Sequence, residues 1–324
     1  MTPTAARAGR AASRPSQARW LGAYLFTRTF DPEHIDDVIL DVIAPVLADP
    51  IVKKATIRSF FVRFRDYGPH VRLRIKVPET ALEHVRKRVE CIIAEHLTAA
   101  HAGTPTKPMP DSATPSSMAS LVFQPYVPEE LRYGGPHGLA IAEAFFQTSS
   151  RLSITLLAAL RQQRLDRSGV GLGVMLAIMR GLARGERQMA TLAGDYAHSF
   201  GRGWVERWYG NERAEAMVDR PVRELEAAMA PQLQALRHAA RHDALPGLIQ
   251  AYARAAATYR RKLVALIATR KFNGQDGSPH KTLRAGLHYV APSLLHMTTN
   301  RLGIDNPLEC RLTETLARSY RRDQ

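Results

Sequence analysis

Acidic residues are scarce in this sequence of 324 residues. Lysine and arginine together number 45, aspartate and glutamate only 30, and the formal net charge at pH 7 is +15. A protein so far from neutrality attracts negatively charged partners, such as nucleic acid, anionic lipid or an acidic substrate. Charge alone does not choose among these three.

Cysteine is also scarce. Cys91 and Cys310 are the only two, they lie far apart, and neither belongs to a CxxC motif. This spacing excludes a disulfide scaffold and a cysteine-based metal site. We therefore expect two reduced thiols in a cytoplasmic protein.

Long hydrophobic runs are missing. The best candidate, residues 169–179, is stopped by Arg180 and is too short to span a bilayer. Residues 1–17 contain no acidic residue and lack the apolar core of a secretion signal. We expect them to form a disordered basic tail, and we expect no membrane association.

The rest of the sequence has the composition of a globular protein. Hydrophobic residues make up 45% of it, which is ordinary for a chain that buries a core. Aromatic, aliphatic and alternating stretches predict strands, whereas apolar residues at helical spacing predict helices. Strands are expected at residues 20–27, 59–65, 70–77 and 121–127, and helices from Asp31-Pro32 onward and over residues 79–97.

These patterns predict a single domain of the α+β class over residues 18–324. Residues 18–135 would form an N-terminal antiparallel sheet with flanking helices, interrupted by a loop rich in Pro, Ser and Thr at residues 99–118. Residues 136–324 would be mostly helical. Helix breaks are expected near residues 168–173, 209–211, 243–247 and 273–279.

The predicted hairpin at residues 59–77 carries many arginines. Arg72 and Arg74 alternate with apolar residues in its second strand, as Arg63 and Arg65 do in its first. If the apolar residues of both strands pack on one core, all four arginines share the other face of the sheet. Because like charges on neighbouring strands repel, that face is either a solvated outer surface or a carboxylate or phosphate site.

Four segments follow one another in a recognisable order. They read FFVRFRDYGPHVRLR at residues 60–74, YVPEELRYGG at 126–135, AEAFF at 142–146 followed by Ser149-Ser150, and SLLHM at 293–297 followed by Asn300-Arg301-Leu302-Gly303. Together they resemble the C-terminal elimination domain of lantibiotic dehydratases, which also occurs as a separate protein in thiopeptide pathways. The resemblance spans about residues 20–316.

The resemblance implies a two-step dehydration of a ribosomal precursor peptide. In this family, glutamate is first transferred from glutamyl-tRNA to a Ser or Thr hydroxyl, and the elimination domain then removes it to leave dehydroalanine or dehydrobutyrine. The long glutamylation domain of full-length members is not found here. The resemblance therefore implies a separate glutamylation subunit, a substrate made of a leader and a glutamylated core, and no direct binding of tRNA.

The same resemblance indicates the catalytic residues of this lyase. The family's important arginines fall on Arg72 and Arg74 in the hairpin and on Arg132 before Tyr-Gly-Gly, and its histidine falls on His296. β-Elimination needs a base near Cα and a partner for the enolate-like charge. Histidine suits proton transfer, and arginine suits carboxylates. This set requires no metal and no other cofactor.

Seven further residues are expected to contact the substrate: Arg63, Arg65, His70, Tyr133, Glu143, Asn300 and Arg301. Asn300 lies one helical turn beyond His296 and could orient an amide of the substrate. We expect their helix to have Pro292 in its first turn and to end at Gly303. Glu143 either pairs with an active-site arginine or supports helix packing.

Two other functions stay open. Thiopeptide pyridine synthases resemble these domains and join two dehydroalanines by a formal 4+2 cycloaddition, with release of the leader peptide. The arginines and His296 favour elimination, because a cycloaddition has no glutamate to bind. A non-catalytic subunit that holds peptide or tRNA is the second alternative, and the net charge allows it.

Two weaker signals carry no function. His238 and His242 are four residues apart, but the glutamate of His-Glu-x-x-His and a third ligand are missing, so we expect no metal site. Gly169, Gly171 and Gly173 lack the spacing and the preceding strand of a dinucleotide-binding fingerprint.

Overall fold

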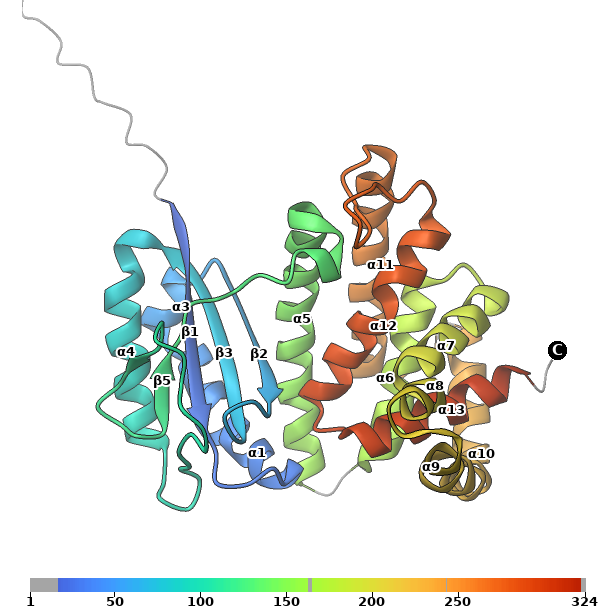
Figure 1. Ribbon diagram of the computed structural model, residues 1–324, viewed down its shortest axis with the longest axis horizontal. Coiled ribbons are helices and arrows are strands. Elements are labelled where there is room, and N and C mark those ends of the chain that lie inside the picture. The colour runs from blue at the N-terminus through green and yellow to red at the C-terminus, as the bar shows by residue number, and fades with distance from the viewer. Residues whose placement is uncertain (1–16, 163–164, 243, 322–324) are drawn as a thin grey trace, which may run out of the picture.

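The computed structural model describes residues 17–162, 165–242 and 244–321. A sheet with its own helices forms one half of the molecule, a set of packed helices forms the other, and α5 stands between them (Figure 1). The predicted α+β class is confirmed. The tail expected at residues 1–17 lies outside the described residues except for Gln17, whose carbonyl accepts a hydrogen bond from the Glu79 amide.

The sheet has five strands in the order β2-β3-β1-β5-β4, and each neighbouring pair is antiparallel. The strands are β1 (Ala18–Phe26), β2 (Arg58–Phe64), β3 (His70–Pro78), β4 (Thr114–Pro115) and β5 (Leu121–Phe123). The hairpin expected at residues 59–77 is therefore confirmed. β4 lies within the segment expected to be a loop at residues 99–118.

Helices cover one face of this sheet. They are α1 (Pro32–Val38), α2 (Ala44–Ala48), α3 (Pro50–Ala55) and α4 (Leu82–His96), with a π-helical segment at Ile39–Ile43 and a short 3-10 turn at Glu79–Ala81. The Asp31 side chain caps α1 by accepting a hydrogen bond from the Glu33 amide at 3.3 Å. The aliphatic residues of β3 pack against these helices in a core that also contains Phe61.

The register of the hairpin corrects one prediction. Val62 pairs with Arg72, and Arg63 pairs with Val71. Paired residues point to the same side of a sheet. Arg72 therefore lies with Val62 on the face that α1–α4 leave uncovered, which we call the open face. Arg63 lies with the aliphatic residues of β3 on the face that these helices cover, the covered face. The prediction that all four hairpin arginines share one face is therefore wrong.

The reason for this error is that β2 is buried on both sides. Phe61 packs in the sheet core, whereas Phe60 belongs to the core of the helical half. Alternation does not reveal which side faces which core when both sides of a strand are apolar.

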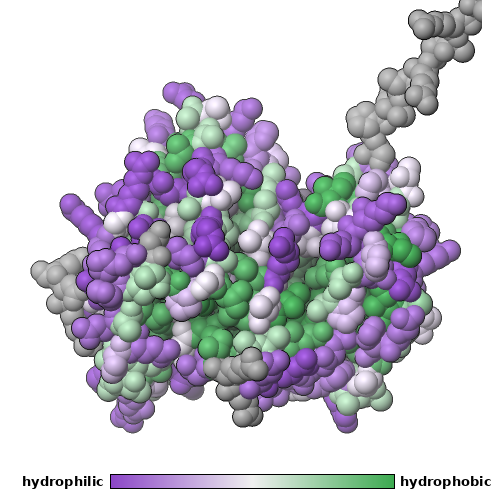
Figure 2. Space-filling model, turned by 180° about the vertical axis from the view of Figure 1, so that it is seen from behind, coloured by the Kyte–Doolittle hydropathy of each residue, from purple (hydrophilic) through white to green (hydrophobic). Residues whose placement is uncertain are grey.

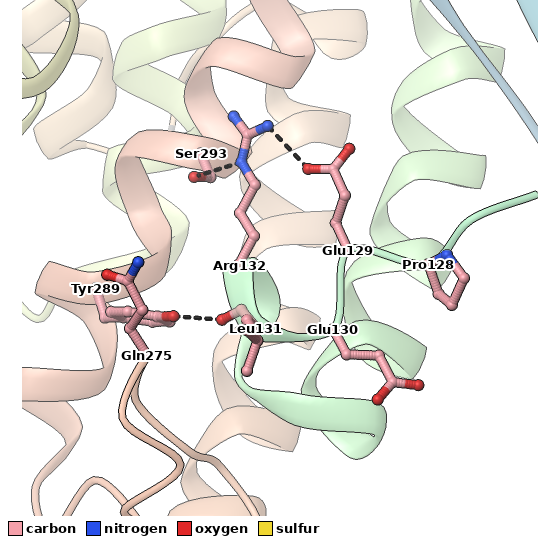
Figure 3. A pocket seen from close by; sticks show the side chains of 8 residues that line it. All are labelled: Pro128, Glu129, Glu130, Leu131, Arg132, Gln275, Tyr289 and Ser293. Carbon is pink, nitrogen blue, oxygen red and sulfur yellow. Dashed lines mark hydrogen bonds and ion pairs between the residues drawn. The ribbon is translucent and has the colours of Figure 1, made fainter.

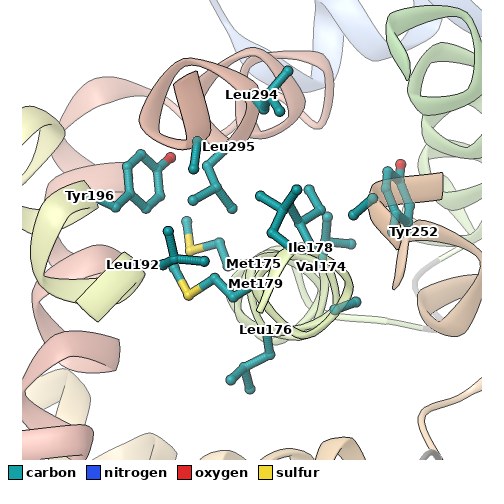
Figure 4. Close-up of a cluster of buried hydrophobic side chains, with 14 of the residues drawn as sticks. Val174, Met175, Leu176, Ile178, Met179, Leu192, Tyr196, Tyr252, Leu294 and Leu295 are labelled. Carbon is teal, nitrogen blue, oxygen red and sulfur yellow. The ribbon is translucent and has the colours of Figure 1, made fainter. Parts of the chain in front are cut away.

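The helical half is built around α6. Its helices are α5 (Gly135–Arg161), α6 (Arg167–Leu182), α7 (Glu186–Phe200), α8 (Arg202–Tyr209), α9 (Asn211–Ala214), α10 (Arg220–Arg241), α11 (Gly247–Ala268), α12 (Leu283–Arg301) and α13 (Asn306–Arg321), with a 3-10 turn at Leu131–Tyr133 and a π-helical segment at Glu215–Asp219. Side chains of α6 project from all round the helix toward Leu192 and Tyr196 of α7, Tyr252 of α11 and Leu294 of α12 (Figure 4). This core fixes the position of α12, which carries His296.

Two helix boundaries differ from the sequence predictions. Residues 168–173 lie inside α6, where a Cβ on Gly171 would stand 2.6 Å from the Ile304 side chain, so these glycines serve close packing rather than a break. Pro292 lies in the interior of α12 and not in its first turn. The breaks expected near residues 209–211 and 273–279 are present.

The surface is not uniformly hydrophilic. From behind, hydrophobic residues gather in the hollow centre of the molecule, and hydrophilic residues surround them (Figure 2). Within the described ranges, none of the helices combines the length and the hydrophobicity needed to cross a membrane.

Candidate functional site

Arg72 lies on the open face of the sheet between two aromatic rings. Its guanidinium carbon is 3.2 Å from the centre of the Phe64 ring and 4.6 Å from that of Tyr24. Such stacking orients a guanidinium without neutralising it. Burial and the nearby charge of Arg74 both lower the pKa of Arg72.

His70 holds Arg72 from the side. The Arg72 Nε donates to His70 Nε2 at 2.9 Å, and His70 Nδ1 lies 2.9 Å from the carbonyl oxygen of Gly68. Only a neutral ring with its hydrogen on Nδ1 satisfies both contacts. Burial lowers the pKa of His70 to about 4, in agreement with this assignment. His70 thus acts on Arg72 as a hydrogen-bond acceptor.

Arg74 is the second cation on this face. Its guanidinium carbon lies 4.3 Å from the centre of the Tyr126 ring, the residue is only 7% exposed, and its Nη1 has no hydrogen-bond partner. Tyr126 belongs to the connection from β5 to α5, which crosses the open face of the sheet (Figure 1). No carboxylate of the described residues forms an ion pair with Arg72 or Arg74.

Arg63, on the other face, is bound by the protein through both of its Nη atoms, while its buried Nε has no hydrogen-bond partner. Its Nη2 pairs with the buried Asp36, its Nη1 donates to the Pro32 carbonyl at 3.1 Å, and its Nη2 also donates to the Arg301 carbonyl at 3.2 Å. Asp36 pairs in addition with Arg167 at 2.6 Å. These contacts give Arg63, expected to bind substrate, a structural role between the two halves.

Asn300 is likewise committed to the protein itself. Its Oδ1 accepts from the Arg63 amide at 2.9 Å, and its Nδ2 donates to the Arg63 carbonyl at 3.0 Å. The Asn300 side chain therefore binds the edge of β2 through its carbonyl oxygen and one hydrogen of its NH2 group, and it also lines the pocket of His296. Arg65, just beyond the end of β2, is exposed beside Phe30 at 5.1 Å.

His296 forms a histidine–carboxylate pair that the sequence did not reveal. Its Nδ1 lies 2.9 and 3.1 Å from the two carboxylate oxygens of Glu309, and its ring stacks on Phe200 with centroids 4.3 Å apart. Glu309, from α13, is only 2% exposed. An ionised Glu309 can only accept, so a hydrogen of His296 lies on Nδ1, and in the neutral ring Nε2 has the lone pair that a base requires.

Two more groups fix Glu309. Thr299 donates to its Oε1 at 2.9 Å, and the Tyr196 hydroxyl donates to the same oxygen. Burial and Glu309 raise the pKa of Tyr196 well above its usual value, which keeps the tyrosine a donor. The carboxylate of α13 is therefore held by three side chains, one from α7 and two from α12.

Arg132 lies in a separate pocket of about 490 Å³ in front of α12 (Figure 3). Its Nε donates to Ser293 Oγ at 3.2 Å, and its Nη1 donates to Glu129 at 3.0 Å. Ser293 is three residues before His296, so the two are neighbours on one face of α12. Arg132 thus touches the helix that carries the candidate base.

Three further residues are expected from the sequence to contact the substrate: Glu143, Arg301 and Tyr133. Glu143 pairs with Arg58 at 3.2 Å and not with a hairpin arginine proposed for catalysis. Arg301 is fully buried, donates to Ser150 Oγ at 3.0 Å and lies over Phe146, and its burial lowers its pKa to about 10. Tyr133 is also buried, which raises its pKa to about 12.

The four predicted catalytic residues are divided between two pockets and the open face of the sheet. His296 lines a pocket of about 240 Å³ together with Arg63, Arg65 and Asn300. Phe64 lines the same pocket and stacks on Arg72, so it connects the open face to the histidine. Arg132 lines the other pocket, and neither pocket is lined by Arg72 or Arg74.

Sequence reasoning missed Glu309 and the aromatic partners of the arginines. Glu309 lies in an amphipathic helix among other charged residues, where nothing distinguishes it from an exposed glutamate. Tyr24 and Tyr126 lie in segments remote from the hairpin in sequence. The pairing of β1 with β3 brings Tyr24 to Arg72, and the connection that follows β5 brings Tyr126 to Arg74.

Comparison with protein families decides the relationship. The family model described as the C-terminal part of the lantibiotic biosynthesis dehydratase matches residues 20–320. The chain belongs to this family. Membership makes it an enzyme of peptide modification, in the biosynthesis of ribosomally synthesised and post-translationally modified peptides. A search of curated proteins finds no match.

Solved structures share the fold of this family member. TsrL is 17% identical with a TM-score of 0.72, over 95% of each chain. The pyridine synthase TbtD from thiomuracin biosynthesis is 17% identical with a TM-score of 0.70, over 94% of this chain and 99% of that one. The tRNA-dependent lantibiotic dehydratase MibB from Microbispora sp. 107891 is 22% identical with a TM-score of 0.54, over 98% of this chain but 29% of that one.

Proposed function

We propose that this chain eliminates glutamate from glutamylated Ser or Thr residues of a ribosomal precursor peptide. The products would be dehydroalanine or dehydrobutyrine in the peptide, and free glutamate. A separate glutamylation subunit would supply the substrate in the cytoplasm, and residues 18–324 would act as one elimination domain. The proposal rests on the resemblance of the four sequence segments and on the charges described above.

The observation that carries the proposal is the pair of unneutralised guanidiniums on the open face. Arg72 and Arg74 are stacked on aromatic rings without an ion-pair partner among the described residues, whereas Arg63 of the same hairpin has Asp36. Holding cations together without a counter-ion costs free energy unless an anion binds. A glutamyl group supplies carboxylates, which guanidiniums bind well.

His296 is the proposed base. Its Nε2 would remove the proton from Cα of the glutamylated residue, and the electron pair of that bond would form the Cα–Cβ double bond. The Cβ–O bond would break at the same time, so glutamate would leave as its carboxylate. Arg72, Arg74 and Arg132 would stabilise the negative charge that develops on the leaving carboxylate and on the peptide carbonyl.

Mass spectrometry tests this reaction directly. The purified chain is mixed with a purified glutamylated precursor, and we expect each modified site to lose glutamate and leave a dehydrated residue. His296→Ala should leave the glutamylated peptide intact, whereas Arg86→Gln, in an ion pair of α4 on the other side of the sheet, should not change the reaction. Glutamylated peptide that survives the wild-type chain would disprove elimination.

A pyridine synthase is the second candidate. It is favoured by the likeness in fold to the pyridine synthase TbtD over nearly the whole of both chains. In that case the chain would join two dehydroalanines by a formal 4+2 cycloaddition and expel the leader peptide. Incubation with a fully dehydrated precursor separates the two activities, because only a cyclase gives a pyridine macrocycle and a free leader.

A non-catalytic subunit is the third candidate, and the net charge of +15 supports it. Binding of peptide or tRNA with no change in the mass of either precursor would be the expected result. Binding of tRNA would also weaken steeply with salt, because its phosphates release counter-ions.

A further inference from the structure

A third pocket lies between the beginnings of α7 and α12, which run side by side in the helical half (Figure 1). Its volume is about 910 Å³, compared with about 490 Å³ around Arg132 and 240 Å³ around His296. Arg184, Arg187 and Arg284 line it, together with the buried side chains of Leu192 and Leu287. We call it the basic pocket. It has room for several side chains of a peptide.

The three arginines of the basic pocket form no ion pair with the part of the chain that the structure describes. Among the described residues, no carboxylate forms an ion pair with the side chain of Arg184, Arg187 or Arg284. Other arginines of the helical half do have partners: Arg202 binds Asp219 at 3.0 Å, and Arg321 binds Glu314 at 3.4 Å. The three guanidiniums outnumber the one carboxylate that lines the pocket, that of Asp195, so the lining carries a net positive charge.

Two acidic residues lie near the pocket. Asp195 lines it, where its Oδ1 lies 3.0 Å from His288 Nδ1 and its buried Oδ2 has no hydrogen-bond partner. Glu186, at the start of α7, pairs with Arg241 at 2.6 Å. Arg260 of α11 is near enough for the charge of Arg184, after burial, to lower its pKa. The electrostatic field of the pocket thus favours an anionic ligand.

The basic pocket lies along the same helix pair as His296. Asp195 of α7 contacts His288 of α12, and the next residue of α7, Tyr196, contacts Glu309 beside His296. His288 and His296 are eight residues apart on α12, which corresponds to about 12 Å along the helix. An extended peptide covers that distance with about four residues.

We propose that the basic pocket binds an acidic segment of the precursor peptide, and that this contact holds the peptide while one of its residues lies at His296. The apolar floor of Leu192 and Leu287 favours a peptide with alternating acidic and aliphatic side chains over an RNA backbone. That the peptide is the precursor rests on the proposed function, whereas the binding of an acidic peptide does not.

Fluorescence anisotropy with a labelled peptide tests the proposal. The probe is the peptide ELEELE, and its neutral counterpart QLQQLQ and a labelled hexauridylate RNA are compared with it. We expect the wild-type chain to bind ELEELE at least about tenfold more tightly than QLQQLQ, with an affinity that falls as salt is added. Equal binding of the two peptides would overturn the proposal, as would tighter binding of the RNA in this pocket.

A matched pair of variants locates the binding. Arg184→Glu, Arg187→Glu and Arg284→Glu together should weaken ELEELE binding by at least about tenfold. Arg213→Glu, Arg220→Glu and Arg223→Glu change the net charge equally at exposed positions outside the pocket, and should change affinity by less than about threefold. Equal losses in the two triple variants would show that the net charge binds the peptide rather than the pocket.

A kinetic measurement separates this inference from the proposed reaction. With a full glutamylated precursor, the pocket variant should show a raised KM and an unchanged kcat. Anisotropy needs no turnover, so pocket-dependent binding of ELEELE would stand even if the chain does not eliminate glutamate. Normal elimination and an unchanged KM in the pocket variant would overturn the docking site alone.

Discussion

Arg63 and Arg72 lie on neighbouring strands of one hairpin, but on opposite faces of the sheet. Arg63, on the covered face, is locked by Asp36 and by backbone carbonyls. Arg72, on the open face, is stacked between Phe64 and Tyr24 and has His70 as its side-chain hydrogen-bond partner. The same residue type therefore joins two halves of the protein on one face and offers a free charge on the other.

The difference between the faces lies in what neutralises the charge. A buried ion pair contributes to the structure because removal of one partner leaves the other unpaired in the interior. An arginine held by aromatic rings and a neutral histidine is oriented in advance but keeps its charge for a ligand.

Asp36→Ala should produce the largest loss of stability. It would leave Arg63 and Arg167 without their shared carboxylate, and we expect the free energy of unfolding to fall by about 3–5 kcal/mol. Urea unfolding followed by circular dichroism measures this. Asp37→Ala, at the half-buried neighbouring position, is the control and should cost less than about 1 kcal/mol. Equal losses in both variants would remove the distinction between the two faces.

Arg72→Gln should lower the rate of elimination rather than the stability. Stability should change little, because Arg72 takes part in no ion pair with a described residue, whereas kcat for elimination should fall by about 10²–10³-fold. Single-turnover measurements with glutamylated precursor give the rate, and urea unfolding gives the stability. A variant that unfolds easily but retains its rate would assign Arg72 to the structure.

The sequence predicted the elements of this site better than their arrangement. Strand alternation located Arg72 and Arg74 on one side of β3, and the family resemblance singled out Arg132 and His296. Neither strand alternation nor the resemblance could predict on which face of the sheet Arg63 lies, because Phe60 and Phe61 of β2 are both buried.

Long-range contacts account for what the sequence could not predict. Glu309 reaches His296 only through the packing of α13 against α7, and Asn300 binds the edge of β2. Such contacts between segments distant in sequence leave no periodic signal. Local patterns therefore predict elements, whereas the identity of partners requires the fold.

Glu309→Gln should affect turnover more than stability. Asp36 and Glu309 are both buried carboxylates, but Glu309 contacts a histidine, a tyrosine and a threonine rather than an arginine. The amide keeps a hydrogen-bond acceptor for His296 and loses the charge, so we expect kcat to fall by about tenfold to a hundredfold at an unchanged KM.

Glu314→Gln is the matched control for this variant. Glu314 is also a buried carboxylate of α13, but it contacts the Arg202 amide and Arg321 instead of His296. Its replacement should leave kcat unchanged. If both variants lower kcat equally, α13 acts through its packing, and Glu309 has no special relation to the base.

His70→Gln should have the smallest effect, a change in how stability depends on pH. It tests whether a neutral histidine holds Arg72. Burial lowers its pKa to about 4, so the unfolded chain, with an ordinary histidine pKa, binds more protons than the folded chain between about pH 4 and 6.5. The neutral ring therefore contributes stability that is present above about pH 6.5 and is lost as the pH falls toward 4. From pH 7 to pH 5, we expect the free energy of unfolding of the wild-type chain to fall by about 1–2 kcal/mol more than that of His70→Gln, whose amide does not titrate.

His84→Gln, at an exposed position, is the control and should follow the wild type. An identical pH dependence in all three proteins would mean that Arg72 is not held by a neutral histidine.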